Sequence, residues 1–326
     1  MPPVTGPPFA SEPSGSESSG SEPSAASGTG GLVAGLAEIG AAEAGPGHEP
    51  VVLYDRHGVL VVRVGHVVVK AHQPDRGGGP PLEARMRVAG ALPDLLLPAL
   101  GPPRSLAGRV VTLWPYGEPV APDPGPGALP WEDGARLLAR LHTTPPPEGT
   151  PAWGRPERVA RLVGELDGGT PAEREILRAF ATLPAWIRGE APLPEERGGF
   201  RRLLHGDWHL GQMVRVEGTW RLIDVEDLGT GDPAWDLARP AALYSAGLLA
   251  HDDWARFLGA YRAFQGPAVP AEGDPWEVLD VPARTLVIQI AATCVKSARR
   301  AGRPLDGPEE ALVDTCSRIS SVRSPA

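Results

Sequence analysis

The chain has 326 residues, a formal net charge of −9 at pH 7 and an isoelectric point near 5.4. Its length suits one large or two modest domains, and its acidic balance argues against a protein that binds nucleic acid. No apolar run reaches the roughly 18 residues of a membrane span, and the N-terminus lacks the pattern of a secretory signal. These features predict a cytoplasmic protein without a membrane partner, whose two cysteines, Cys294 and Cys316, are reduced.

Residues 1–48 are predicted to be a low-complexity N-terminal segment. Ser, Gly, Pro, Glu and Ala dominate the first 30 or so positions, and such a composition buries too little apolar surface to offset the entropy cost of ordering. Within this segment, the apolar residues of 32–44 predict a short helix, which the Gly-Pro-Gly at 45–47 ends.

Residues 49–116 are predicted to form a small β-rich lobe. Three Val-rich runs, 51–54, 59–64 and 67–70, follow one another closely and predict an antiparallel meander. Lys70 ends the third run. It is one of only two lysines in an Arg-rich chain, which indicates a role that Arg cannot fill.

The second half of this lobe contains three further residues of interest. Glu83 heads a predicted helix after a Gly- and Pro-rich loop and offers Lys70 an acidic partner. A strand at 109–113 leads to Trp114 and Tyr116 in a connector punctuated by Pro and Gly. Such a connector is typical of the hinge between two lobes, where backbone groups read an adenine edge and an aromatic side chain packs nearby. A surface position for Lys70 and a core position for Trp114 are the structural alternatives.

Residues 117–322 are predicted to form a larger, mainly helical lobe, followed by a tail at 323–326. Apolar stripes at helical spacing recur from Pro130 onwards. Thr170-Pro171-Ala172-Glu173 has the pattern of a capping box with Pro at the first helical position. Two C-terminal helices are predicted as well, over 286–300 and 309–320.

The most informative motif is His205-Gly206-Asp207-Trp208-His209-Leu210-Gly211-Gln212, with Ile223-Asp224 shortly after it. Phosphoryl transfer to a hydroxyl needs one carboxylate to orient the acceptor and take its proton. A second carboxylate and an amide oxygen hold Mg²⁺ at the ATP phosphates. Strand-like runs at 212–216 and 219–223 predict a hairpin that brings Asp224 back beside Gln212. A chance match in a solvated turn is the structural alternative.

Three motifs in order carry a resemblance to the aminoglycoside phosphotransferase and choline-kinase-like family. They are the loop above, Ile223-Asp224-Val225-Glu226, and Gly231-Asp232-Pro233-Ala234-Trp235-Asp236-Leu237-Ala238. The resemblance implies an α+β, bilobal protein-kinase-like fold, with a small antiparallel β N-lobe and a larger, mainly helical C-lobe.

The same resemblance implies roles for individual residues. Asp207 would be the catalytic base, and Gln212 and Asp224 the metal ligands. Asp236 would brace the catalytic loop, which His205 would support through hydrogen bonds. Two roles are left open for His209, namely packing within the loop and contact at the phosphate site. The remaining nucleotide-binding candidates are Lys70, Glu83, Trp114 and Tyr116.

The predicted function is ATP- and Mg²⁺-dependent transfer of the γ-phosphoryl group to a hydroxyl of a small molecule, either a sugar or an aminoglycoside-like amino sugar. Gln212 and Glu226 are similar to the corresponding residues of maltokinase-type members, which favours a sugar. A catalytically silent nucleotide-binding sensor with the same fold is the alternative. A protein kinase is disfavoured, because the segment between Asp224 and Asp236 is too short for a conventional activation loop.

Overall fold

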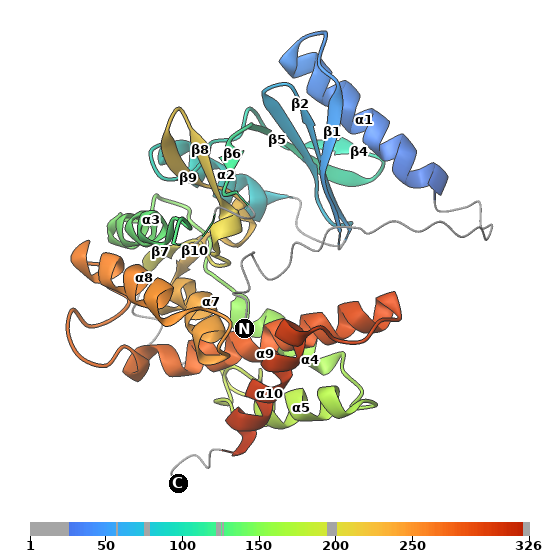
Figure 1. Ribbon diagram of the computed structural model, residues 1–326. Coiled ribbons are helices and arrows are strands. Elements are labelled where there is room, and N and C mark those ends of the chain that lie inside the picture. Colours follow the sequence, from blue (N-terminus) through green and yellow to red (C-terminus); the bar gives the residue numbers. More distant parts are fainter. Residues whose placement is uncertain are drawn as a thin grey trace. The chain divides into compact units, whose positions relative to one another are not determined.

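The computed structural model describes residues 26–56, 58–74, 79–121, 125, 127–193 and 201–321. The chain divides into two compact units. Unit 1 takes the chain as far as Pro124 and again from Met213 to Glu226, and unit 2 contains 125–212 and 227–326. The two units are coloured by sequence position in Figure 1.

The division differs from the predicted lobes in one respect. The predicted boundary after residue 116 lies close to the end of the first part of unit 1, but the segment 213–226 was predicted to belong to the helical lobe. The structure places this segment in unit 1, where its first strand pairs with a short strand at Glu118–Pro119. The first 25 residues and the predicted tail at 323–326 lie outside the described residues.

Unit 1 is built on a five-stranded sheet in the order β1-β2-β3-β5-β4, in which all neighbours are antiparallel. Its elements are α1 (Ala26–Ala44), β1 (Pro50–Arg56), β2 (Val59–Val64), β3 (Val67–Ala71), α2 (Pro80–Ala91), β4 (Arg104–Leu106) and β5 (Arg109–Pro115). The predicted meander of the first three strands is therefore confirmed. Side chains along β2 and β3 alternate between buried and half-buried positions, as expected of strands with one face covered.

Helix α1 provides that cover (Figure 1). Its Leu36 is fully buried in one apolar cluster with Val62, Val64 and Val69 of the sheet. The helix approaches closely at Gly40, where a Cβ atom would lie 2.7 Å from Cγ2 of Val64. It begins at Ala26, earlier than the predicted residue 32, although glycines disfavour helix in that stretch.

A second sheet of unit 1, in the order β6-β8-β9, contains the predicted hairpin. Its strands are β6 (Glu118–Pro119), β8 (Met213–Val216) and β9 (Thr219–Leu222). The turn between β8 and β9 has positive φ at Glu217 and Gly218, 49° and 78°, as a two-residue hairpin turn requires. Met213 pairs with Leu222, so Gln212 and Ile223-Asp224 continue the chain from the same end of the hairpin.

Unit 2 is mainly helical, with one two-stranded antiparallel sheet of β7 and β10. Its elements are α3 (Trp131–Thr143), α4 (Arg155–Gly164), α5 (Pro171–Ala181), β7 (Arg202–Leu204), a 3₁₀ turn η1 (Leu210–Gln212), β10 (Gly229–Gly231), α7 (Ala234–Ser245), α8 (His251–Ala263), α9 (Trp276–Ala301) and α10 (Gly307–Ser321). A further 3₁₀ turn, η2 (Val225–Asp227), lies where the chain leaves unit 1 and re-enters unit 2. The predicted capping box begins α5, since the backbone N–H of Glu173 donates to Thr170 Oγ1 and that of Thr170 donates to Glu173 Oε2.

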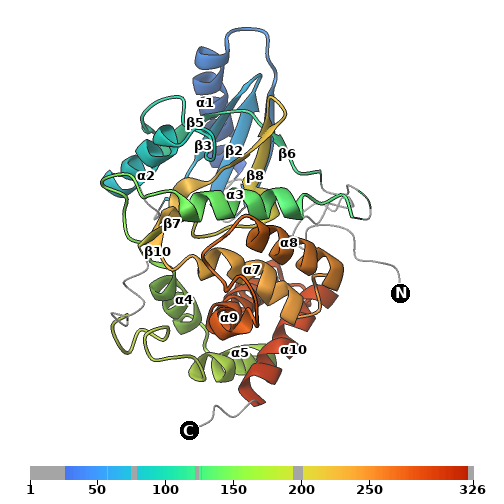
Figure 2. The ribbon, with the colours of Figure 1, turned by 90° about the vertical axis from the view of Figure 1, so that its left-hand side faces the viewer.

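Helix α9 forms the centre of unit 2, among α4, α5, α7 and α10 (Figure 2). It begins at Trp276, ten residues before the predicted start, and includes Pro282. Pro282 is buried, so packing compensates for the backbone hydrogen bond that Pro cannot donate. By length and composition alone α9 could cross a membrane, but 67% of its most apolar window is buried inside the structure.

Candidate active site

The predicted site residues fall into two clusters, one in each unit. Asp207 and Gln212 belong to unit 2, whereas Lys70 and Asp224 belong to unit 1. Each cluster has its own supporting hydrogen bonds.

In unit 2, the loop that follows β7 carries Asp207 and is fixed through its backbone. The N–H groups of His205 and Gly206 donate to the two carboxylate oxygens of Asp236 at 2.6 and 2.7 Å. Gly206 has φ = 86°, and a Cβ atom there would lie 2.2 Å from the carbonyl oxygen of Asp227, so only glycine fits. The expectation that Asp236 braces this loop is confirmed.

Asp236 is in turn held by a buried chain of polar groups. His142 Nε2 lies 2.9 Å from Asp236 Oδ2, and His142 Nδ1 lies 2.7 Å from the hydroxyl of Tyr261. The Tyr261 hydroxyl accepts the N–H of Ala268 and can donate its own proton to Nδ1, an arrangement in which Nε2–H donates to Asp236. Burial alone would raise the pKa of Asp236, but the bonds from His142 and His205 hold it below its ordinary value.

The Asp207 side chain is oriented by helix α7 as well. Arg239, one turn after Asp236, places Nη2 at 2.6 Å from Asp207 Oδ1. Asp207 keeps 34% of its side-chain surface exposed, so its carboxylate is both aimed and accessible. The next residue, Trp208, is buried and stacks on Phe257 of α8 with ring centroids 5.1 Å apart, which anchors the loop in the helical core.

The second half of the loop turns back on itself before β8 begins. His209 Nδ1 accepts the N–H of Gly211 at 3.1 Å, and the carbonyl of His209 accepts the N–H of Gln212 at 2.9 Å. Of the two roles left for His209, these bonds match packing within the loop. Gln212 is half-buried at the end of η1.

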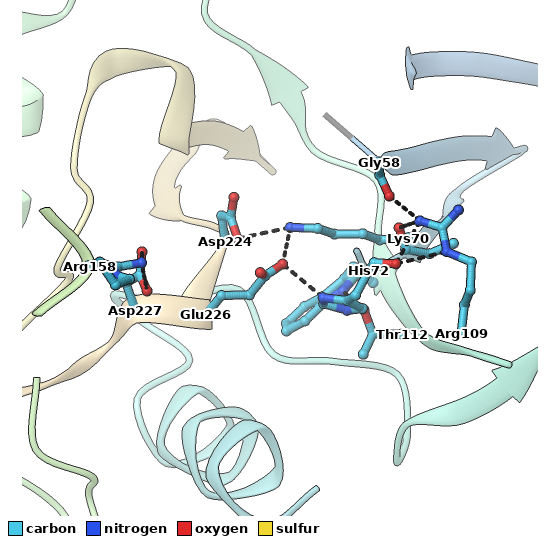
Figure 3. Close-up of polar contacts among 11 residues, drawn as sticks. Gly58, Lys70, His72, Arg109, Thr112, Arg158, Asp224, Glu226 and Asp227 are labelled. Atoms are coloured by element: carbon cyan, nitrogen blue, oxygen red, sulfur yellow. Dashed lines mark hydrogen bonds and ion pairs between the residues drawn. The ribbon is translucent and has the colours of Figure 1, made fainter. Parts of the chain in front are cut away.

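In unit 1, Lys70 lies between two carboxylates (Figure 3). Its Nζ atom is 2.9 Å from Asp224 Oδ1 and 2.5 Å from Glu226 Oε1. Burial alone would lower the pKa of Lys70, but these two carboxylates more than offset burial and raise it above its ordinary range. The ammonium is therefore charged at neutral pH. Asp224 has φ = 60°, a left-handed backbone that Asp tolerates better than most residues.

The predicted pairing of Lys70 with Glu83 is wrong. Glu83 is exposed in the first turn of α2, and the acidic neighbours of Lys70 are Asp224 and Glu226 instead. The reason is topological. The hairpin of β8 and β9 belongs to unit 1 and returns both carboxylates to the end of β3, which the spacing of residues along the chain does not reveal.

The two aromatic candidates of the connector are both half-buried. Trp114 donates its indole N–H to Thr112 Oγ1 at 2.9 Å. The guanidinium carbon of Arg63 lies 3.5 Å from the ring centroid of Tyr116. The backbone N–H of Tyr116 donates to the carbonyl of His66. Their contact with a nucleotide stays a prediction.

Three residues that contact the predicted site residues or the turn beside them were not identified from the sequence. His72 contacts Glu226, with Nδ1 2.8 Å from Oε1. Arg109 donates to the carbonyls of Ala71 and His72 and of Gly58, and so ties the β1–β2 turn to the end of β3 (Figure 3). Arg239 is the third. His72 could have been found, because it lies two positions after Lys70 at the end of the same strand, and alternate residues of a strand share a face.

Comparison with known proteins agrees with this fold. The phosphotransferase enzyme family matches residues 60–276. A choline/ethanolamine kinase family protein from Mesorhizobium loti has a similar structure, with a TM-score of 0.58 at 17% identity, covering 90% of this chain and 95% of that one. An aminoglycoside phosphotransferase from Streptomyces rimosus gives a TM-score of 0.55 at 21% identity, covering 79% and 98%.

A spectinomycin phosphotransferase in complex with ADP and spectinomycin gives a TM-score of 0.57 at 10% identity, covering 88% of this chain and 97% of that one. No curated protein matches the sequence significantly. The family match covers well over half of the chain, and the similar structures share its kinase-like α+β fold. The chain therefore belongs to the phosphotransferase enzyme family.

Proposed function

We propose that this phosphotransferase moves the γ-phosphoryl group of ATP, with Mg²⁺, to a hydroxyl of a small molecule, and that Asp207 is the base. The observation that carries the proposal is the support of Asp207. Its loop is fixed by two backbone hydrogen bonds to the buried Asp236, and its carboxylate is oriented by Arg239 at 2.6 Å. A base must be held within hydrogen-bonding reach of the proton it takes, and this arrangement holds one.

The residues of unit 1 fit the phosphates of a nucleotide. Lys70 is charged, and Asp224 keeps 32% of its side-chain surface exposed. The described residues hold no group of three or more His, Cys, Asp or Glu side chains placed to bind a metal by themselves. Mg²⁺ at nucleotide sites usually takes one or two carboxylates from the protein and its other ligands from phosphates and water, so Asp224, with Gln212 as the proposed second ligand, suits such an ion.

When bound, Mg-ATP would supply the phosphoryl group and the cation that neutralises its charge. The residues of the chain orient the reactants. Asp207 would accept a hydrogen bond from the acceptor hydroxyl and take its proton as the new O–P bond forms, while the bond between the γ-phosphorus and the β–γ bridging oxygen breaks and ADP leaves. Lys70 would contact phosphate oxygens, and Gln212 and Asp224 would hold the metal.

The acceptor is proposed to be a sugar or an aminoglycoside-like amino sugar. Structural relatives named for aminoglycosides and for spectinomycin support a small, hydroxyl-rich acceptor. Glu226, one of the two residues that favoured a sugar, contacts Lys70 and His72. These contacts account for Glu226 without an acceptor, so the choice between the two acceptor classes depends on experiment.

The test is a phosphoryl-transfer screen. Purified protein with Mg-ATP is offered neutral sugars, amino sugars, aminoglycosides and amino alcohols, and both ADP release and phosphorylated product are measured. We expect transfer to one class well above background ATP hydrolysis. Asp207→Asn should lower kcat by about 10² to 10⁴-fold and leave ADP affinity within about twofold. A variant that kept half of the wild-type kcat would remove Asp207 from the role of base.

The screen also separates the enzyme from the sensor. A protein that bound ATP and phosphorylated no member of the panel would contradict the proposed transfer. It would support the catalytically silent nucleotide-binding sensor.

A further inference from the structure

Beside Lys70, four side chains of unit 1 form a chain of polar contacts, here called the relay. Figure 3 labels three of them, Glu226, His72 and Thr112. Glu226 Oε1 lies 2.5 Å from Lys70 Nζ and 2.8 Å from His72 Nδ1. His72 Nε2 lies 2.8 Å from Thr112 Oγ1, which accepts the indole N–H of Trp114 at 2.9 Å. The relay thus connects the end of β5 with the ammonium of Lys70.

The chemistry of its members gives the relay a direction. An indole N–H can only donate, so Thr112 Oγ1 accepts from Trp114 and has its own proton left to donate. Thr112 is fully buried and His72 is 2% exposed, and His72 Nε2 is the partner within reach of that proton. The Thr112 hydroxyl can donate to Nε2, an arrangement in which Nδ1 carries the ring proton and faces Glu226.

We propose that Glu226, held from behind by His72, is the carboxylate that positions Lys70 for the nucleotide phosphates. Glu226 and His72 are positioning residues in this proposal, and Lys70 is the group that touches the phosphates. The proposal rests on the proposed nucleotide-dependent function. In this proposal Glu226 is the acidic partner of Lys70, the role that the sequence analysis predicted for Glu83.

The two carboxylates beside Lys70 differ in exposure, which suits them to different roles. Glu226 is 20% exposed and its Oε1 is buried against His72, whereas Asp224 is 32% exposed. Glu226 contacts both Lys70 and His72, so it is fixed on its protein side, while the more accessible Asp224 suits a metal ion.

The experiment compares the affinities for ADP and for adenosine, which lacks the phosphates that Lys70 contacts. Both are titrated calorimetrically into the full chain with Mg²⁺ present. Glu226→Gln should weaken ADP binding about tenfold, the loss of one charge-assisted contact, and leave adenosine binding within about twofold. Glu83→Gln, the competing variant, should weaken ADP binding much less. A variant that merely misfolds would lose both ligands equally.

A second pair of variants tests the relay at a distance from any metal. Thr112→Val removes the hydroxyl and keeps the shape, and it should weaken ADP binding several-fold. Thr112→Ser, which keeps the hydroxyl, should restore it. In ¹⁵N NMR of labelled histidine, with the signal assigned through His72→Gln, His72 should carry its proton on Nδ1 without nucleotide.

The outcomes separate the two proposals. A wild-type protein that binds neither ADP nor ATP would overturn the proposed function together with this inference. Wild-type binding that survives Glu226→Gln unchanged, or that falls tenfold only in Glu83→Gln, would overturn the inference alone. So would a proton on Nε2 of His72.

Discussion

Asp224 combines an accessible carboxylate with a left-handed backbone at φ = 60°. Asn tolerates this conformation about as well as Asp, whereas a residue such as Ala costs about 1 kcal/mol there. Two substitutions at this position can therefore separate the effect of the backbone conformation from the effect of the charge.

Both variants lose the carboxylate beside Lys70, so Asp224→Ala should lower the free energy of unfolding by about 1 kcal/mol more than Asp224→Asn does, because only Ala is strained at this backbone conformation. Both should lose most of the Mg²⁺-dependent gain in ADP affinity, because neither keeps a carboxylate. Denaturant titration and calorimetry with and without Mg²⁺ measure the two effects. Undiminished Mg²⁺-dependent binding in Asp224→Asn would show that Asp224 is not a metal ligand.

Among the elements, helix α1 packs on the sheet at a position, Gly40, that has no room for a side chain. Gly40 faces Val64 and Val69 of the sheet, and an added Cβ would lie 2.7 and 3.1 Å from their methyl groups. Gly31, on the same helix, has nothing within 4 Å of such a Cβ. The two glycines have the same helix propensity and opposite surroundings.

Gly40→Ala should therefore lower the free energy of unfolding by about 1 to 3 kcal/mol, because it overpacks the contact of helix and sheet. Gly31→Ala should raise it by up to about 1 kcal/mol, because Ala favours helix. Chemical denaturation of the two variants checks the signs. If both stabilised the protein equally, α1 would not pack closely on the sheet.

What the sequence could predict at this scale depended on contacts close along the chain. The meander, the β8–β9 hairpin and the Thr170 capping box involve neighbouring residues, and all three are confirmed. The start of α9 was predicted too late, because Pro282 reads as a helix end until the packing around it is known.

The candidate site was predictable only where a motif contained it. Asp236 lies in a motif of its own, so its bracing of the Asp207 loop was foreseen. Lys70 was identified, but its partners Asp224 and Glu226 lie 154 residues or more along the chain. Such pairings follow from tertiary topology, which local patterns do not encode.

On the scale of the whole molecule, both cysteines lie in the core of unit 2, on α9 and α10. Burial raises the pKa of each thiol to about 12, from an ordinary value of about 8.5. A thiol is neutral when protonated, so the raised pKa favours the folded state fully below about pH 8.5. That contribution is lost as the pH rises from there towards 12.

We expect neither thiol to react with a disulfide reagent at pH 8 in the folded protein, and both to react in denaturant. The free energy of unfolding should also fall as the pH rises from about 8.5 towards 12. Thiol titration with and without denaturant provides the first measurement. Rapid reaction of either cysteine in the native protein would mean that unit 2 opens readily at α9 or α10.

The discontinuity of unit 1 has a consequence for biosynthesis. Strand β6 pairs with β8, and Leu222 exchanges backbone hydrogen bonds with Leu95 and Leu97. A ribosome must therefore add 125–212, all belonging to unit 2, before it makes the hairpin that these earlier residues pair with. A fragment ending near residue 124 would expose those unpaired edges and lack both carboxylates that hold Lys70. The order of translation thus delays completion of the cluster around Lys70 until nearly half of unit 2, 125–212, has been synthesised.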